Sequence, residues 1–305
     1  MSTELYTRQA ELLVRAIPEI AHEEAFALKG GTAINLFVRD LPRLSVDIDL
    51  VYLPIADRDE SLAAIREAFS RIATSLRKRL SAKVAEQNSG DGAKLIVRSA
   101  NTQIKIEISP VLRGTVFEPE LRSVSPSVED RFGYAEMKVV ALPDLYAGKI
   151  AAALDRQHPR DLFDILHLYA NEGITDDIFS AFLIYLISHN RPPNELLAPH
   201  MLDLAPQYSG EFTGMTVEPV PLEALREARD RLLGDIQVRV RKAGPSAFLR
   251  SFFALEPDWS VLNLPSDVAR LPAAQWKLQN LERLRAEQPQ KFKEQLEKLG
   301  EVLKR

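Results

Sequence analysis

The chain has 305 residues, of which 46% are hydrophobic and 27% charged, enough for about two folded domains of ~100–200 residues each. It contains no cysteine, which excludes a disulfide scaffold, a thiol nucleophile and a cysteine-ligated metal centre. The net charge of −4 gives the molecule as a whole no tendency to bind nucleic acid, so any basic surface must be local. Apolar runs are short and interrupted by charge, and we expect a soluble cytoplasmic protein without a membrane segment.

Helical and strand patterns alternate in the first half of the chain. Apolar residues at helical spacing predict a helix that ends near Pro18, and the alternating sequence SVDIDLVYL predicts a strand. An irregular stretch is expected over 111–131. In chain order, the predicted elements are helices 3–17 and 32–38, strand 44–53, helix 57–80, and strands 93–99, 102–109 and 132–140.

After residue 142 the pattern is helical throughout. The expected helices are 143–157, 159–171, 175–189, 222–242 and a charged amphipathic helix over 276–305 that Pro289 interrupts. This order predicts an α+β fold with two domains, an α/β core over 1–142 and a helical domain over 143–305.

Asp47 and Asp49 are two residues apart on a predicted strand, so both carboxylates project from one face while Ile48 and Leu50 point into the core. Two adjacent carboxylates repel each other unless a positive charge lies between them. Magnesium binds through one or two carboxylates together with substrate phosphates, and Mg²⁺ or Mn²⁺ is therefore the expected cofactor. Alternatively, the pair belongs to a solvated edge strand.

Glu107 lies on another predicted strand in the same alternating pattern. On a shared sheet it can reach the face that carries Asp47 and Asp49, as a third metal ligand or as a general base. Alternatively, it faces solvent and pairs with Lys105 or Lys94.

The dipeptide Gly30-Gly31 stands between a short apolar run and a predicted helix, where the backbone can approach a ligand closely. The helix that follows offers free amide groups to a phosphate. Thr32 adds a hydroxyl and is also suited to cap the helix. We therefore predict a phosphate-binding turn at Gly30, Gly31 and Thr32, although tight turns of other kinds have the same sequence.

Two stretches resemble the AbiEii family of nucleotidyltransferases, bacterial toxins of type IV toxin–antitoxin systems to which the mycobacterial MenT toxins are related. One stretch is LKGGTAINL (28–36) followed by LSVDIDL (44–50). The other is DLYAGKIAA (144–152) followed by Arg156 and RDLFDI (160–165), which is similar to the family's downstream lysine and R-D-x-x-D motif. The chain departs from the wider superfamily in having Thr32 where serine is usual and a longer gap before Asp47.

This resemblance implies a DNA polymerase β-like nucleotidyltransferase core with an appended C-terminal helical domain. It also implies transfer of a nucleoside monophosphate from an NTP to a tRNA 3′ end, with translation blocked and an antitoxin as partner. The alternatives are transfer to a small molecule or to a protein, and a module that binds nucleotides without transferring them.

Lys149 interrupts an apolar helical stretch, and a nearly buried lysine needs an anionic partner. We expect it and Arg160 to bind the nucleotide, with Asp164 orienting Lys149 or the base, so that the first two helices of the second domain contribute to the catalytic site. The alternatives are a structural salt bridge for Lys149 and an ion pair between Arg160 and Asp161 at the start of the helix.

Ser45 precedes Asp47 by two residues and is expected on the aspartates' face. In some toxins of the family a hydroxyl residue here is phosphorylated by an antitoxin kinase, which makes Ser45 a candidate regulatory residue. Alternatively, Ser45 only starts the strand. Local basic clusters, such as the arginines of 226–241, fit an RNA-backbone surface or a solvated helix face.

Overall fold

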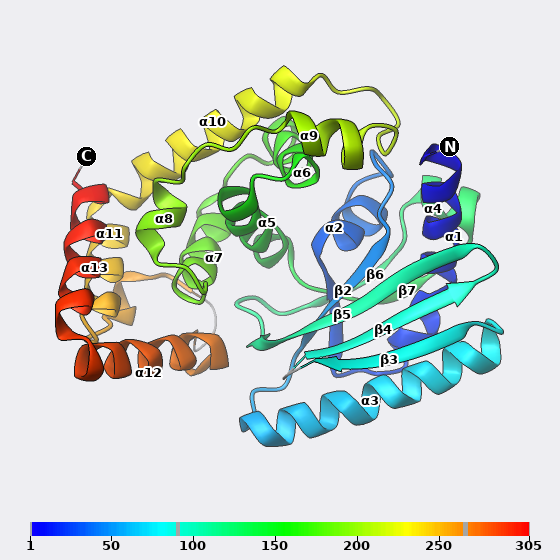
Figure 1. Cartoon of the computed structure of the whole chain (residues 1–305), viewed down its shortest axis with the longest axis horizontal. Helices are drawn as coiled ribbons and strands as arrows, with labels where there is room; N and C mark the ends of the chain where they lie inside the picture. Colours follow the sequence, from blue (N-terminus) through cyan, green and yellow to red (C-terminus); the bar gives the residue numbers. More distant parts are fainter. Residues whose placement is uncertain (1, 90–91, 265–267, 305) are drawn as a thin grey trace. The chain divides into compact units, whose positions relative to one another are not determined.

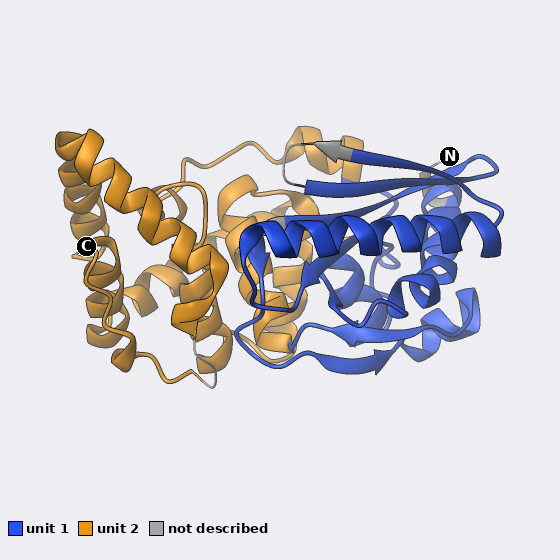
Figure 2. Cartoon of the chain, turned by 90° about the horizontal axis from the view of Figure 1, so that it is seen from below, with its two compact units in different colours: residues 1–141, 212–219 blue, residues 142–211, 220–305 orange. Residues whose placement is uncertain are grey.

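The structure, a computed structural model, describes residues 2–89, 92–264 and 268–304. The chain divides into two units (Figure 2). The first comprises residues 1–141 and 212–219, and the second comprises 142–211 and 220–305. No helix among the described residues is long and apolar enough to cross a membrane.

Among the described residues, seven strands form one mixed sheet in the first unit, in the order β3-β4-β5-β2-β1-β7-β6 (Figure 1). The central strand β2 pairs with β1 in antiparallel and with β5 in parallel orientation. The strands are β1 (Phe26–Lys29), β2 (Asp47–Tyr52), β3 (Lys83–Ser89), β4 (Gly92–Ser99), β5 (Thr102–Arg113), β6 (Glu120–Ser123) and β7 (Glu136–Val139).

Two helices provide most of the helical packing against the sheet of the first unit. α1 (Ser2–Ala21) contacts β5 and β7, and α3 (Arg58–Arg79) contacts β3, β4 and α1. A short helix, α2 (Gly30–Ala33), continues into the π-helix η1 (Ile34–Val38) and contacts β1 and β2. α4 (Pro126–Phe132) lies between β6 and β7 in sequence.

Residues 212–219 belong to the first unit although they lie far along the chain. Arg43 and Thr216 form an isolated antiparallel bridge. The amide of Leu44 donates to the carbonyl of Met215 at 2.8 Å, and Phe212 and Met215 are buried. This segment therefore holds the stretch of chain that leads directly into β2.

The second unit is helical over its described residues, with α5 packed against both α6 and α7. Its α-helices are α5 (Leu142–Arg156), α6 (Pro159–Ala170), α7 (Asp176–Ile187), α8 (Pro193–Leu197), α9 (Ala205–Gln207), α10 (Leu222–Val240), α11 (Ala243–Phe253), α12 (Pro272–Glu287) and α13 (Pro289–Val302). Pro289 starts α13 and so divides the helix expected over 276–305, whose last residue lies outside the described ones.

Several element boundaries differ from the sequence prediction for physical reasons. α1 continues through Pro18 to Ala21, because Ile17 and Ile20 are fully buried and their packing outweighs the lost backbone hydrogen bond. β5 continues to Arg113 with a register shift opposite Leu50 and Tyr52, where an irregular stretch was expected. The unpredicted strand β3 (Lys83–Ser89) is a polar edge strand, a position where natural sheets favour charged residues.

Candidate active site

Asp47 and Asp49 lie at the start of β2 on one face of the sheet. Both are partly exposed, whereas the alternating Ile48 and Leu50 are fully buried. This is the alternation that places successive strand side chains on opposite faces. The two carboxylates therefore share the face predicted from the sequence.

The parallel pairing of β2 with β5 brings a third carboxylate to this face. Glu107 stands directly opposite Asp49, and Lys105 stands opposite Asp47. A cavity of about 340 Å³ lies beside Asp49 and Glu107, and its lining also includes Lys29 and Lys94. The structure thus brings together in one unit the acidic residues that the sequence singled out on separate strands.

Glu107 is paired with two lysines. Its Oε1 lies 2.9 Å from Lys94 Nζ and its Oε2 lies 2.9 Å from Lys105 Nζ, while Lys105 Nζ is 3.9 Å from Asp47 Oδ1. Burial opposes the charged form of Glu107, but the hydrogen bonds from Lys94 and Lys105 outweigh it and hold the Glu107 pKa below its ordinary value. At neutral pH Glu107 is therefore ionised and can accept hydrogen bonds, but it is a weak base.

The donor set at this face suits a hard divalent cation that takes substrate oxygens as further ligands. In the described part of the chain, no three His, Asp or Glu side chains are grouped so as to hold a metal ion by themselves. Asp47 and Asp49 nevertheless supply two hard oxygen ligands on one face, and magnesium commonly binds through one or two carboxylates plus phosphates. The pair fits such a cation.

Gly30 and Gly31 begin α2 directly after β1, close to both Asp49 and Arg43. Gly30 has φ +75°, and a Cβ on it would lie 2.6 Å from Asp49 Oδ2. A Cβ on Gly31 would lie 2.6 Å from Arg43 Nη2. Glycine is thus favoured at Gly30 by its backbone conformation and by the close approach of Asp49, whereas a side chain at Gly31 would have to displace the end of the flexible Arg43 side chain.

Thr32 and Ser45 form a buried hydroxyl pair behind the turn. Thr32 Oγ1 lies 2.8 Å from Ser45 Oγ and also donates to the carbonyl of Asp47. Thr32 is the third residue of α2, whose N-cap is Lys29, so the expectation of a Thr32 cap is wrong. Ser45 lies before β2 rather than in it. The pair connects the glycine turn to the start of the aspartate strand.

Replacing Gly30 by alanine is expected to lower both the stability of the protein and the nucleotide transfer that the resemblance to AbiEii proteins implies. The positive φ costs a residue with a side chain roughly 1–2 kcal/mol. The added methyl group must also displace the Asp49 carboxylate. A misplacement of about 1 Å in an active site can lower the rate by ~10²-fold. Thermal unfolding and kcat/KM for NMP transfer measure the two effects.

Gly234→Ala is the matched control, because Gly234 lies exposed inside α10 and a methyl group added there would meet no other atom within 4 Å. It should raise stability by about 0.5–1 kcal/mol and leave transfer unchanged. Equal changes in stability and in transfer for Gly30→Ala and Gly234→Ala would contradict the role assigned to the Gly30 turn.

In the second unit, Lys149 of α5 lies in a buried ion network with two acids of α6. Its Nζ is 2.8 Å from Asp161 Oδ1 and 3.0 Å from Asp164 Oδ2. Arg156 adds hydrogen bonds of 2.6 and 3.0 Å to Asp161. Burial opposes ionisation of Asp161, but the charges of Lys149 and Arg156 outweigh it and hold the Asp161 pKa well below its ordinary range. The anionic partners that Lys149 requires are thus supplied by the chain itself.

Arg160 pairs elsewhere. Its Nη2 lies 3.7 Å from Glu211 Oε2, and His158 Nε2 lies 3.1 Å from the same oxygen. The ion pair between Arg160 and Asp161 considered from the sequence is therefore wrong, because Asp161 faces α5. Asp164 and Asp161 are fully buried, whereas Arg160 is partly exposed.

Sequence reasoning missed two basic residues of the first unit. Lys29 lines the cavity beside Asp49, and Arg43 is a buried cation whose guanidinium lies against Gly31. Lys29 directly precedes the glycine pair, a signal that could have been used. Arg43 is placed by the pairing with Thr216, which no local pattern in the sequence indicates.

A family model described as "Nucleotidyl transferase AbiEii toxin, Type IV TA system" matches residues 11–280. Because this match spans most of the chain, the protein belongs to the AbiEii family and is a nucleotidyltransferase toxin of the type IV toxin–antitoxin class. Membership of this class implies an NTP substrate and an antitoxin partner, and nucleotidyltransferases of this family generally use a divalent metal ion.

One solved structure with a similar fold is MenT4, a nucleotidyltransferase toxin from Mycobacterium tuberculosis H37Rv. It has a TM-score of 0.57 and 16% sequence identity, and the match covers 98% of this chain and 99% of MenT4. The expected nucleotidyltransferase core with C-terminal helices is thereby confirmed as the fold. The search of curated proteins found no match.

Proposed function

We propose that this nucleotidyltransferase transfers a nucleoside monophosphate from an NTP to the 3′-terminal hydroxyl of tRNA, releasing pyrophosphate and blocking translation. The observation that carries the transferase site is the pairing of Asp47 and Asp49 on β2 with a glycine turn packed against Asp49. The resemblance of the glycine and DxD motifs to those of MenT toxins supports tRNA as the acceptor.

Asp47 and Asp49 would hold Mg²⁺ or Mn²⁺ with phosphate oxygens of the NTP as further ligands. The bound cation would supply Lewis-acid stabilisation of charge on the transferred phosphoryl group. A metal-ligand role for Glu107 would require its two lysine pairs to break, and we therefore assign the cation to the two aspartates.

The other residues of the candidate site would bind and orient the reactants. The amides of Gly30 and Gly31 would approach the phosphates, and Thr32 would fix the turn to the aspartate strand. Glu107 would accept a hydrogen bond from the acceptor hydroxyl and so orient it, because a carboxylate with a lowered pKa is a poor base. Lys29 and Lys94 would offset phosphate charge.

The buried pairing of Lys149 with Asp161 and Asp164 favours the structural alternative for this lysine. A role of Lys149, Asp164 and Arg160 in nucleotide binding stays a prediction, which rests on the resemblance of the R-D-x-x-D motif. The α10 arginines also have acidic partners: Arg226 pairs with Glu223, and Arg239 with Asp176.

Incubation of the purified protein with each NTP, labelled at the α-phosphate, and total RNA tests the acceptor. Label on tRNA is the expected result, and it should be absent when the RNA is oxidised with periodate before the incubation, since oxidation destroys the 3′-terminal hydroxyl that accepts the nucleotide. Label on protein or on an added small molecule, with none on RNA, would contradict the tRNA assignment while leaving the transferase site intact.

Ser45→Glu is expected to abolish transfer, whereas Ser45→Ala is expected to retain it. Ser45 is only 6% exposed and bonded to Thr32, which in turn donates to the carbonyl of Asp47. A negative charge here is expelled from its buried position and displaces the start of β2. A kinase antitoxin would accordingly need local opening of this segment before phosphorylation.

The neutral variant Ser45→Gln separates charge from size in the same transfer assay, with thermal unfolding measured in parallel. Loss of activity in Ser45→Glu well beyond that in Ser45→Gln supports a charge-sensitive regulatory position. Full activity of Ser45→Glu would exclude it.

A further inference from the structure

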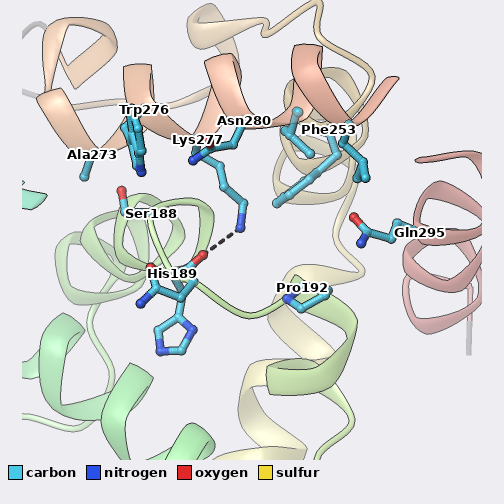
Figure 3. Close-up of a pocket in the computed structure, with 12 residues that line it drawn as sticks. Ser188, His189, Pro192, Phe253, Ala273, Trp276, Lys277, Asn280 and Gln295 are labelled. Atoms are coloured by element: carbon cyan, nitrogen blue, oxygen red, sulfur yellow. Dashed lines mark hydrogen bonds between the residues drawn. The ribbon is translucent and has the colours of Figure 1, made fainter. Parts of the chain in front are cut away.

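A second cavity, of about 300 Å³, lies within the helical unit (Figure 3). It is formed by α12, the segment after α7 that contains His189 and Pro192, Phe253 at the end of α11, and Gln295 of α13. None of the described residues that line it is aspartate or glutamate, although the chain has 43 acidic residues. The cavity is thus lined by one lysine, three side-chain amides, a histidine, a serine and apolar groups.

Lys277 extends into this cavity from α12 (Figure 3). Its Nζ donates to the carbonyl of His189 at 2.6 Å and lies 5.9 Å from the centroid of the Phe253 ring. Among the described residues, no carboxylate forms an ion pair with it. Burial lowers the pKa of Lys277 to about 8. Such an ammonium group is stabilised by an anion that enters the cavity.

The other lining groups suit a flat ring with hydrogen-bonding edges. Trp276, next to Lys277 on α12, is 43% exposed and lines the cavity. Aromatic side chains of this kind stack on nucleobases whatever their sequence. The amides of Asn190, Asn280 and Gln295 each carry a donor and an acceptor for the edges of such a ring.

We propose that this cavity binds a single nucleotide, with its phosphate at Lys277 and its base against Trp276. The volume lies at the lower end of the range for ligand pockets, roughly 300–1,000 Å³, which favours one nucleotide over two. The nucleotide is either a free mononucleotide or an unpaired nucleotide of an RNA strand. The candidate active-site residues do not line this cavity, so the proposal goes beyond the transfer reaction.

The proposal predicts that affinity decreases as pH rises above about 8, because Lys277 then loses its charge. Burial lowers the pKa of His189, so its ring is neutral over this range, and the ring lies 3.7 Å from Asp155 of α5. Arg191 pairs with Asp155 and Glu195. The residues that α11 and α13 contribute, Phe253 and Gln295, are uncharged.

Fluorescence of Trp276 reports binding in the full chain. In a Trp259→Phe background, Trp276 is the only tryptophan, and phenylalanine keeps an aromatic ring against Phe248 and Phe252. The probes are AMP, adenosine, ribose 5-phosphate and a five-residue adenylate RNA, all in EDTA to exclude metal-dependent binding at Asp47 and Asp49. We expect saturable quenching by AMP or by the RNA. Adenosine and ribose 5-phosphate should bind with at least tenfold lower affinity.

Tighter binding of the RNA than of AMP identifies an RNA strand as the source, and the reverse identifies a free nucleotide. Lys277→Gln should weaken binding at least tenfold at pH 7 and abolish the pH dependence, while Lys298→Gln, an exposed lysine of α13, should change neither.

Lys277→Met, measured by thermal unfolding, separates ligand binding from a structural role and should leave stability unchanged or raised. The proposal is overturned by the absence of saturable quenching, by affinity that Lys277→Gln leaves unchanged, or by a loss of stability in Lys277→Met that accounts for the loss of binding. Because no transfer is measured, failure here leaves the tRNA proposal untouched, and failure of that proposal leaves this one untouched.

Discussion

Asp49→Asn is expected to reduce NMP transfer by ~10²–10³-fold or more while the protein stays folded, since this is the range for loss of one preorganised electrostatic group. Asparagine preserves the shape of the side chain beside Gly30 but removes the charge that would hold the cation. Asp49 is partly exposed and lies next to Asp47, so its neutralisation also relieves carboxylate repulsion. The melting temperature without metal should therefore be unchanged or slightly raised.

The measurements are kcat/KM with labelled NTP over a range of Mg²⁺ and Mn²⁺ concentrations, and thermal unfolding without metal. Glu86→Gln is the matched control, because Glu86 is also a strand carboxylate of the first unit but pairs with Arg77 outside the cavity. Near wild-type transfer by Asp49→Asn in excess magnesium would refute the metal assignment. Asp47→Asn should behave in the same way.

Lys149→Met is expected to destabilise the protein by about 3–5 kcal/mol, the typical result of removing one partner from a buried ion network. The change leaves the fully buried carboxylates of Asp161 and Asp164 without the ammonium group that lies 2.8 and 3.0 Å from them. Methionine retains the length of the side chain, so packing within α5 is largely preserved. Urea denaturation at pH 7 measures the loss.

The free energy of unfolding that this ion network contributes should depend on pH. The Asp161 pKa is lowered in the folded protein, so the pairing contributes stability above the unfolded-state pKa of about 3.9 and this contribution is lost as pH falls below it. Stability should therefore decrease from pH 5 to pH 3, and the decrease should be smaller in Lys149→Met. Replacing Asp164 by leucine in the same chain should recover part of the stability.

Transfer by folded Lys149→Met at low temperature then decides between the two roles of the lysine. Activity close to that of the wild type establishes a structural role. Loss of activity with less than ~1 kcal/mol of destabilisation, about the value of an exposed pair, would establish nucleotide binding instead.

The sequence allowed prediction of the aspartate face because strand alternation has a period of two residues, and only one register places Ile48 and Leu50 inside. The pairing of Glu107 with lysines was among the alternatives, but periodicity does not specify which charges meet across two strands. Whether Lys149 meets a ligand or Asp164 depends on how α5 packs against α6. The burial of Ser45 depends on a contact with Thr32 across a turn, which spacing does not reveal.

The return of residues 212–219 to the first unit makes that unit discontinuous, with consequences for synthesis of the toxin on the ribosome. The amide of Leu44 and the bridge at Arg43 find their partners, Met215 and Thr216, only after a large part of the helical unit has been translated. Contacts between residues so distant in sequence form late. We expect the segment leading into the aspartate strand to be incompletely ordered in the nascent chain, which delays activity until most of the toxin has been synthesised.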